Sequence, residues 1–215
     1  DITNRSQFNI VFDNIIKEFG GLDLCLFSSG TYEPKDEQNI DSDKIKNECN
    51  KYIDNIERLF GTDGIRGRVN GDKINASMAV KIAMAAGEYF FGKAGTKRPR
   101  VLIGKDTRLS GYMLEPALVA GFTSLGIDSI TTGPLPTPGI AHLTNVLRCD
   151  LGVMISASHN PYQDNGLKFF NSDGFKLRDN VENQIQSLLK KGPSLSSPEN
   201  LGRARRMEDA IGRYI

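Results

Sequence analysis

A run without polar side chains that stops at a polar, proline-broken loop most constrains how this chain folds. The run is Leu151–Ile155, and the loop reads Ser156-Ala157-Ser158-His159-Asn160-Pro161. Such a run predicts a buried strand, and open α/β sheets bind their ligands at the carboxyl ends of strands. A short turn at Asp164-Asn165-Gly166 and a second apolar run then return Lys168 to the same edge. The sequence therefore predicts an antiparallel strand pair that presents a serine and a lysine together.

From residue 58 onward the chain alternates strand-like and helix-like segments. Val101–Ile103 and Ile127–Thr131 read as short buried strands. Other segments repeat apolar residues at three- and four-residue spacing, which predicts helices that bury one face. These positions are Ala79, Ile82, Ala83, Ala86 and Phe90; Leu114, Leu118, Phe122 and Leu125; Ile140, Leu143 and Val146; and Val181, Ile185, Leu188 and Leu189. The alternation predicts a three-layer α/β/α domain, and the short turn between the last two strands makes its sheet mixed.

The first 57 residues follow a different pattern. Residues 1–40 combine an amphipathic helix pattern, a stop at Gly20-Gly21 and an apolar run at Leu22–Phe27, which predicts a short α/β fragment. Their order resembles the middle of a short-chain dehydrogenase, and the resemblance implies that Asp1 lies beside an adenine. The family's Gly-rich fingerprint and its Tyr-x-x-x-Lys pair are absent, so ancestry is implied and activity is not. Residues 41–57, rich in Asp, Glu, Lys and Asn, predict a linker.

Composition narrows the partners and the compartment. A formal net charge of +1 gives no electrostatic footprint for nucleic acid or an acidic membrane, so neither is expected as a partner. No apolar run approaches the length that a membrane-spanning helix needs. Cys25, Cys49 and Cys149 are odd in number and widely spaced, which fits neither a zinc pattern nor a disulfide framework. We expect a reducing, cytoplasmic location.

Two further motifs precede the predicted strand pair. They are Phe60-Gly61-Thr62-Asp63-Gly64-Ile65-Arg66-Gly67 and Gly104-Lys105-Asp106-Thr107-Arg108. With the serine loop and the Asp164–Phe170 segment, in this order, they resemble the first domain of the α-D-phosphohexomutases. The first motif is most similar to the phosphoglucosamine mutase branch of that family. The resemblance implies that residues 58–200 are domain I and that residues 201–215 begin a truncated second domain.

The resemblance also implies roles for individual residues. Ser158 is the expected nucleophile, phosphorylated in the active enzyme, whereas Ser156 is structural. Arg66 and Lys168 are the expected cations beside its phosphate, because phosphoryl transfer depends on placing and neutralising charge. Lys168 is also expected to move a proton to or from the sugar hydroxyl. His159 is also expected in the catalytic set, where it holds the phosphoserine loop, contacts the phosphate or transfers a proton directly.

A further set of residues is expected to surround the phosphate or the substrate. It comprises Asp106, Arg108 and Asn160. For Arg108 two arrangements stay open, because its guanidinium could pair with a carboxylate or face the phosphate. His142, in a predicted apolar helix, is expected to be structural.

The implied reaction interconverts glucosamine 6-phosphate and glucosamine 1-phosphate. It needs a phosphosugar substrate, Mg²⁺, and glucosamine or glucose 1,6-bisphosphate as activator. The family's acidic metal loop, sugar loop and terminal phosphate clamp do not occur in this sequence, so the phosphate on Ser158 is the only expected metal contact. Phosphomannomutase and phosphoglucomutase activities stay open, as do an NAD(P)-dependent dehydrogenase remnant and a non-catalytic fusion fragment. The isolated chain is expected to be inactive.

Overall fold

A computed structural model describes residues 59–91 and 98–215 of the chain. The chain divides into two compact units, Asp1–Ile56 and Glu57–Ile215, and the described residues belong to the second. The predictions for residues 1–40 and for the linker at 41–57 lie outside the described residues. Within the described ranges, no helix is both long and apolar enough to cross a membrane.

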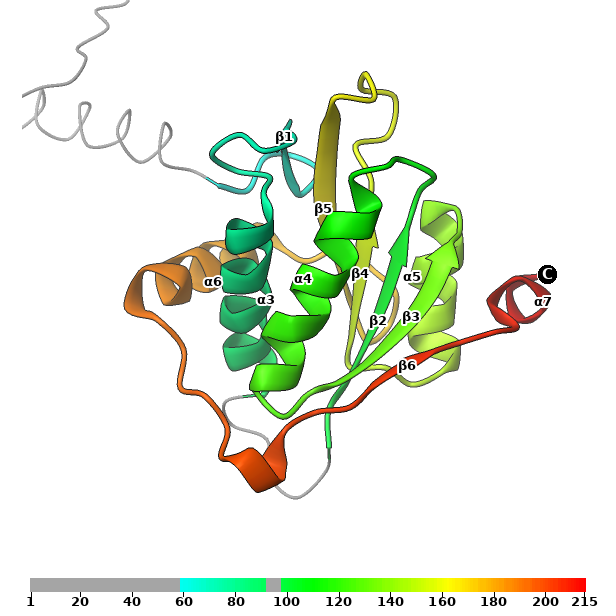
Figure 1. The fold of residues 1–215 in the computed structure, drawn as a ribbon. Coiled ribbons are helices and arrows are strands. Elements are labelled where there is room, and N and C mark those ends of the chain that lie inside the picture. Colours follow the sequence, from blue (N-terminus) through cyan, green and yellow to red (C-terminus); the bar gives the residue numbers. More distant parts are fainter. Residues whose placement is uncertain (1–58, 92–97) are drawn as a thin grey trace, which may run out of the picture. The chain divides into compact units, whose positions relative to one another are not determined.

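A six-stranded sheet forms the centre of the described unit (Figure 1). Its strands are β1 (Ile65–Arg68), β2 (Arg100–Lys105), β3 (Asp128–Pro134), β4 (Leu151–Ile155), β5 (Asp164–Asn171) and β6 (Ala204–Arg206). They lie in the order β1-β5-β4-β2-β3-β6. β5 runs antiparallel to both of its neighbours, whereas β4, β2, β3 and β6 pair in parallel. The sheet is therefore mixed, as the sequence predicts.

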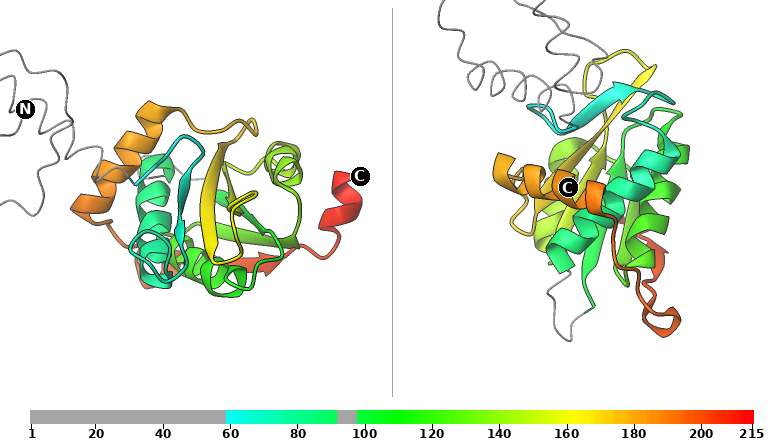
Figure 2. Two further views of the ribbon diagram at one scale, coloured as in Figure 1. Left: turned by 90° about the horizontal axis from the view of Figure 1, so that it is seen from above. Right: turned by 90° about the vertical axis from the view of Figure 1, so that its left-hand side faces the viewer.

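Helices cover both faces of this sheet (Figure 2). They are α3 (Ala76–Phe91), α4 (Gly111–Ser124), α5 (Thr137–Val146), α6 (Asp179–Lys191) and the short α7 (Ala210–Tyr214). One apolar core joins the sheet to α3, α4 and α6, and a second joins its other face to α5 and α7. Burial of these two apolar faces stabilises the three layers. The predicted α/β/α architecture is confirmed.

The reversal between β4 and β5 differs from the prediction. Asp164-Asn165-Gly166 is not a turn but the first part of β5, and the chain reverses in the loop before it. Position 166 requires glycine, because the neighbouring strands' backbones approach it closely. A Cβ there would lie 2.7 Å from the Ile65 carbonyl oxygen and 2.8 Å from that of Ser156. An Asn-Gly pair favours hairpin turns, and here that local preference yields to the strands packed on both sides.

The topology places one crevice at the carboxyl end of the sheet. The chain leaves β2 through α4 on one face, and it enters β4 from α5 on the other face. β2 and β4 are nonetheless neighbours, with Lys105 paired with Ile155 at their ends. Open α/β sheets bind ligands where adjacent strands diverge to opposite faces in this way. The loops after β2 and β4 are therefore the expected positions of a site.

Candidate active site

The loop after β4 holds Ser158 in an unusual backbone conformation. Ser158 has a φ of 59°, in the left-handed region that non-glycine residues rarely adopt. Its backbone N–H donates to the buried Ser156 Oγ at 3.0 Å, so the first serine fixes the position of the second. The Ser158 residue is exposed, whereas Ser156 is buried. Backbone strain of this kind costs about 1–3 kcal/mol and is concentrated at functional sites.

Arg108, from the loop after β2, holds this serine loop in place. Its Nε donates to the Asp106 carboxylate at 2.9 Å. Its two terminal nitrogens donate to four loop carbonyls at 2.6–3.0 Å, those of Ser158, Asn160, Pro161 and Asp164. A guanidinium has five N–H groups, and this arrangement uses all of them. Of the two arrangements left open by the sequence, the structure has carboxylate pairing, and a phosphate contact would require giving up one of these bonds.

Asp63 brings the two predicted cations together. Its Oδ2 pairs with Lys168 Nζ at 2.7 Å and also with the guanidinium of Arg66. β1 supplies Arg66 and β5 supplies Lys168, and Arg66 lies opposite Gly166 in the register. Burial alone would raise the pKa of the Asp63 carboxyl, but the hydrogen bonds and charges of Lys168 and Arg66 together lower it. A carboxylate is thus held ionised between two cations.

Gly64 allows β1 to approach β5 in this way. Its φ is +83°, and a Cβ there would lie 2.3 Å from the Leu167 carbonyl oxygen. The motif therefore needs glycine at this position both for its backbone angle and for space. Asp63 and Arg66 on either side of the turn consequently face Lys168 on the neighbouring strand.

Asn160 connects the cations to the serine loop. Its Oδ1 accepts from Arg66 Nη1 at 3.4 Å, and its Nδ2 donates to Asp164 Oδ2 at 2.9 Å. His159 is exposed in the same loop and makes no side-chain hydrogen bond with the described residues. His142, predicted to be structural, is exposed on α5 and lies edge-on to Tyr214 with their ring centroids 6.3 Å apart.

The structure thus places the predicted site residues at the end of the sheet where β2 and β4 stop. It adds two residues that sequence reasoning did not single out. Asp63 is the first. It lies three residues before Arg66 in the same glycine-bounded motif, and this spacing is the sequence signal that could have indicated their pairing. Ser110 is the second, because its Oγ accepts from Asn165 Nδ2 at 2.7 Å and ties the start of α4 to β5. Nothing in the local sequence pairs these two residues.

No group of three or more His, Cys, Asp or Glu side chains that could hold a metal ion occurs in the ranges 59–91 and 98–215. Asp63 and Asp106 are each engaged with a cationic side chain. These residues do not form a magnesium site by themselves.

Comparison with known proteins identifies the class to which this fold and site belong. Residues 57–195 match the family described as phosphoglucomutase/phosphomannomutase, alpha/beta/alpha domain I. A phosphoglucomutase/phosphomannomutase family protein from Burkholderia thailandensis has a similar fold, with a TM-score of 0.63 and 24% identity over 73% of this chain and 34% of that one. The chain belongs to this phosphohexomutase family.

More similar sequences narrow the comparison. The phosphoglucosamine mutase of Erythrobacter litoralis is 60% identical over 158 residues, which are 74% of this chain and 34% of that protein. The phosphoglucosamine mutase of Zymomonas mobilis is 58% identical over 158 residues, with 74% and 35% covered. This chain therefore spans about a third of the length of these curated relatives. The dehydrogenase-like resemblance of residues 1–40 lies outside the family match and has no support from it.

Proposed function

We propose that this chain carries the phosphoserine domain of a phosphoglucosamine mutase, with residues 58–200 as domain I. Residues 201–215, which still contribute β6 and α7 to this unit, would lead into the next domain. The single observation that carries the proposal is the continuous set of contacts from Lys168 through Asp63 and Arg66 to Asn160 in the serine loop. This set links two cations to the loop that carries the strained, exposed Ser158. A phosphorylated serine carries nearly two negative charges, which such cations neutralise.

In the proposed reaction Ser158 is the phosphoryl carrier. The bond between its Oγ and phosphorus breaks while a hydroxyl oxygen of the phosphosugar bonds to phosphorus. The hydroxyl proton ends on Ser158 Oγ, relayed by Lys168, so that serine and a bisphosphorylated sugar result. The same steps in reverse return the other phosphate to the serine. Glucosamine or glucose 1,6-bisphosphate serves as activator because it can phosphorylate the serine at the start.

The remaining residues position these groups. Asp106 and Arg108 hold the loop, and Asn160 joins the loop to Arg66. All three residues are also proposed to border the phosphate or the substrate. His159, exposed beside Ser158, is placed to contact the phosphate or the substrate. Magnesium, on which the family generally depends, would contact the described residues only through the phosphate oxygens on Ser158 and would supply charge neutralisation there. No step here requires a metal ligand from these residues.

Glucosamine phosphate is the proposed substrate because the curated relatives at 58–60% identity are phosphoglucosamine mutases. Phosphomannomutase and phosphoglucomutase activities are the alternatives, because the matched family bears both names. Substrate assays of one chimera test whether this domain supports the glucosamine reaction. In it, residues 58–215 of this chain replace the 158 matching residues of the Erythrobacter litoralis enzyme.

The same chimera tests the role of Ser158. It is incubated with glucosamine 1,6-bisphosphate, and the phosphopeptide is mapped by mass spectrometry. We expect phosphate on Ser158, no phosphate on the Ser158→Ala variant, and retained labelling of Ser156→Ala. Label on Ser156, or turnover of glucosamine 6-phosphate by Ser158→Ala, would contradict the proposal.

A further inference from the structure

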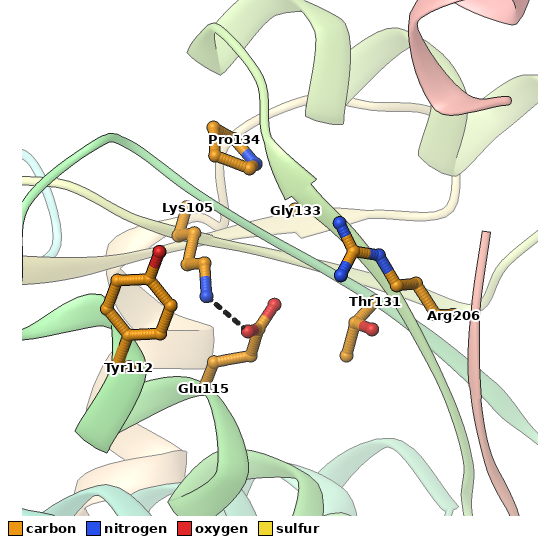
Figure 3. A pocket seen from close by; sticks show the side chains of 7 residues that line it. All are labelled: Lys105, Tyr112, Glu115, Thr131, Gly133, Pro134 and Arg206. Atoms are coloured by element: carbon orange, nitrogen blue, oxygen red, sulfur yellow. Dashed lines mark hydrogen bonds and ion pairs between the residues drawn. The ribbon is translucent and has the colours of Figure 1, made fainter. Parts of the chain in front are cut away.

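A pocket lies at the carboxyl ends of β2 and β3, and it shares no lining residue with the Ser158 loop. Its lining is Lys105, Tyr112, Glu115, Thr131, Gly133, Pro134 and Arg206 (Figure 3). β6 contributes Arg206 from the edge of the sheet, and α4 contributes Tyr112 and Glu115. The proposed mutase chemistry uses none of these side chains.

One wall of the pocket is a buried ion pair. The Lys105 side chain is only 9% exposed, and its Nζ lies 2.6 Å from Glu115 Oε2 and 4.3 Å from the centre of the Tyr112 ring. An ammonium has three N–H groups, so the bond to Glu115 leaves others for a ligand. The second oxygen of the carboxylate, Oε1, is buried and accepts no hydrogen bond within the described part of the chain. A buried carboxylate oxygen without a donor is unfavourable.

The opposite wall carries a charge that is not neutralised. Arg206 forms no ion pair with the residues that the structure describes. Figure 3 shows its guanidinium beside Gly133, facing the same pocket that Lys105 and Glu115 line. Gly133 has a φ of +76°, and a Cβ there would lie 3.3 Å from Arg206 Nη2. Glycine therefore leaves room for the guanidinium to lie against the backbone. Two cations and one carboxylate give the pocket a net positive charge.

We propose that this pocket is a binding site for a tetrahedral oxyanion that carries a hydroxyl, namely inorganic phosphate or the phosphate group of a monoester. Arg206 and Lys105 donate to its charged oxygens. Its hydroxyl donates to Glu115 Oε1 and supplies the hydrogen bond that this oxygen lacks. Sulfate at neutral pH has no proton, so it would set a lone pair against the carboxylate.

The size of the pocket agrees with this ligand. Its volume is about 80 Å³. One water needs about 10–15 Å³ of such space, so the pocket holds several non-hydrogen atoms, as a tetrahedral oxyanion requires.

The test is a titration of the 215-residue chain with sodium phosphate at constant ionic strength and pH 7, followed by backbone amide shifts in NMR spectra. We expect saturable shifts at Lys105, Thr131, Gly133 and Arg206, and affinity for sodium sulfate weaker by about tenfold, the value of one charged hydrogen bond. Parallel titrations with phosphate and glycerol 3-phosphate at pH 5.5, below the monoester's second pKa of about 6, identify the source. Equal affinity indicates a monoester phosphate, and weaker affinity indicates the free ion.

Variants separate this site from general attraction of anions to the chain. Arg206→Gln should weaken phosphate binding about tenfold, and Glu115→Gln should remove the preference for phosphate over sulfate. Arg205→Gln is the matched control, because Arg205 is the neighbouring exposed cation on β6 and does not line the pocket. Equal weakening by Arg205→Gln and Arg206→Gln, shifts confined to the Ser158 loop, or no saturation would overturn the proposal.

Discussion

At the scale of single residues, Arg66 and Lys168 both pair with the Asp63 carboxylate, and under the proposed function each neutralises part of the phosphate charge. Arg66→Ala or Lys168→Ala in the chimera should lower turnover of glucosamine 6-phosphate by about a hundredfold or more. The reason is that either change leaves phosphate charge without a partner. The exposed Lys81→Ala on α3 is the control, with turnover unchanged. Full turnover in Arg66→Ala and Lys168→Ala would contradict these roles.

Asp63 makes a pH-dependent contribution to stability. Its folded-state pKa is lowered by Lys168 and Arg66, against an unfolded value of about 3.9. A lowered pKa means that the stabilisation is present above about pH 4 and is lost as the pH falls through the folded-state pKa. Asp63→Asn should therefore lower the free energy of unfolding at pH 7 by about 1 kcal/mol or less, because the carboxylate is partly exposed.

Urea unfolding at several pH values measures this effect. The difference between Asp63→Asn and the unmodified chain should shrink as the pH falls below about 4. The exposed Asp173 provides a control, since Asp173→Asn should change the unfolding midpoint little at any pH. A difference for Asp63→Asn that stays constant down to pH 2 would show that the carboxylate charge is not the cause.

Arg108 acts on the serine loop through its full set of donors. Lysine at this position keeps the charge but cannot reproduce five N–H groups in a planar fork. Arg108→Lys should therefore lower the free energy of unfolding by roughly 1–2 kcal/mol, because several partly exposed loop carbonyls lose their donor. Amide exchange in residues 158–164 should also become faster. Arg100→Lys is the control, because it removes a single hydrogen bond to the Arg148 carbonyl. It should lower the free energy of unfolding less and leave amide exchange in residues 158–164 unchanged.

At the scale of elements, β5 depends on a glycine between its two neighbours. Gly166→Ala would place a methyl group against the Ile65 and Ser156 carbonyl oxygens, which are backbone atoms that cannot rotate away. We expect a loss of about 1–3 kcal/mol in the free energy of unfolding. Gly67→Ala on β1 is matched to it, because its nearest contact is at an ordinary 3.5 Å from Lys73 Cβ. Equal unfolding midpoints for the two variants would contradict the argument.

The same elements show what the sequence could and could not predict. The apolar runs of β2 and β4 and the apolar stripes of α3 to α6 are local patterns, and they predicted the layers correctly. β1 and β6 are short and polar, with Arg66, Arg68, Arg205 and Arg206 among their residues, so periodicity does not mark them. They become strands only because β5 and β3 offer them partners. The roles of Asp63 and Arg206 follow from those pairings, which no local pattern contains.

At the scale of the whole molecule, the described unit holds the proposed phosphate carrier and its proposed cations, but the matched part covers only about a third of the curated relatives. Phosphoryl transfer requires donor, acceptor and metal in near-attack geometry, and such placement is worth about 7–11 kcal/mol of the barrier. We therefore predict no measurable interconversion of glucosamine phosphates by the isolated 215-residue chain and clear turnover by the chimera. Both are assayed at equal concentration with Mg²⁺ and glucosamine 1,6-bisphosphate. Comparable turnover by the two would show that the described residues suffice. If the chimera is folded and phosphorylated on Ser158 but inactive, the failing step is phosphate transfer from the serine to the sugar.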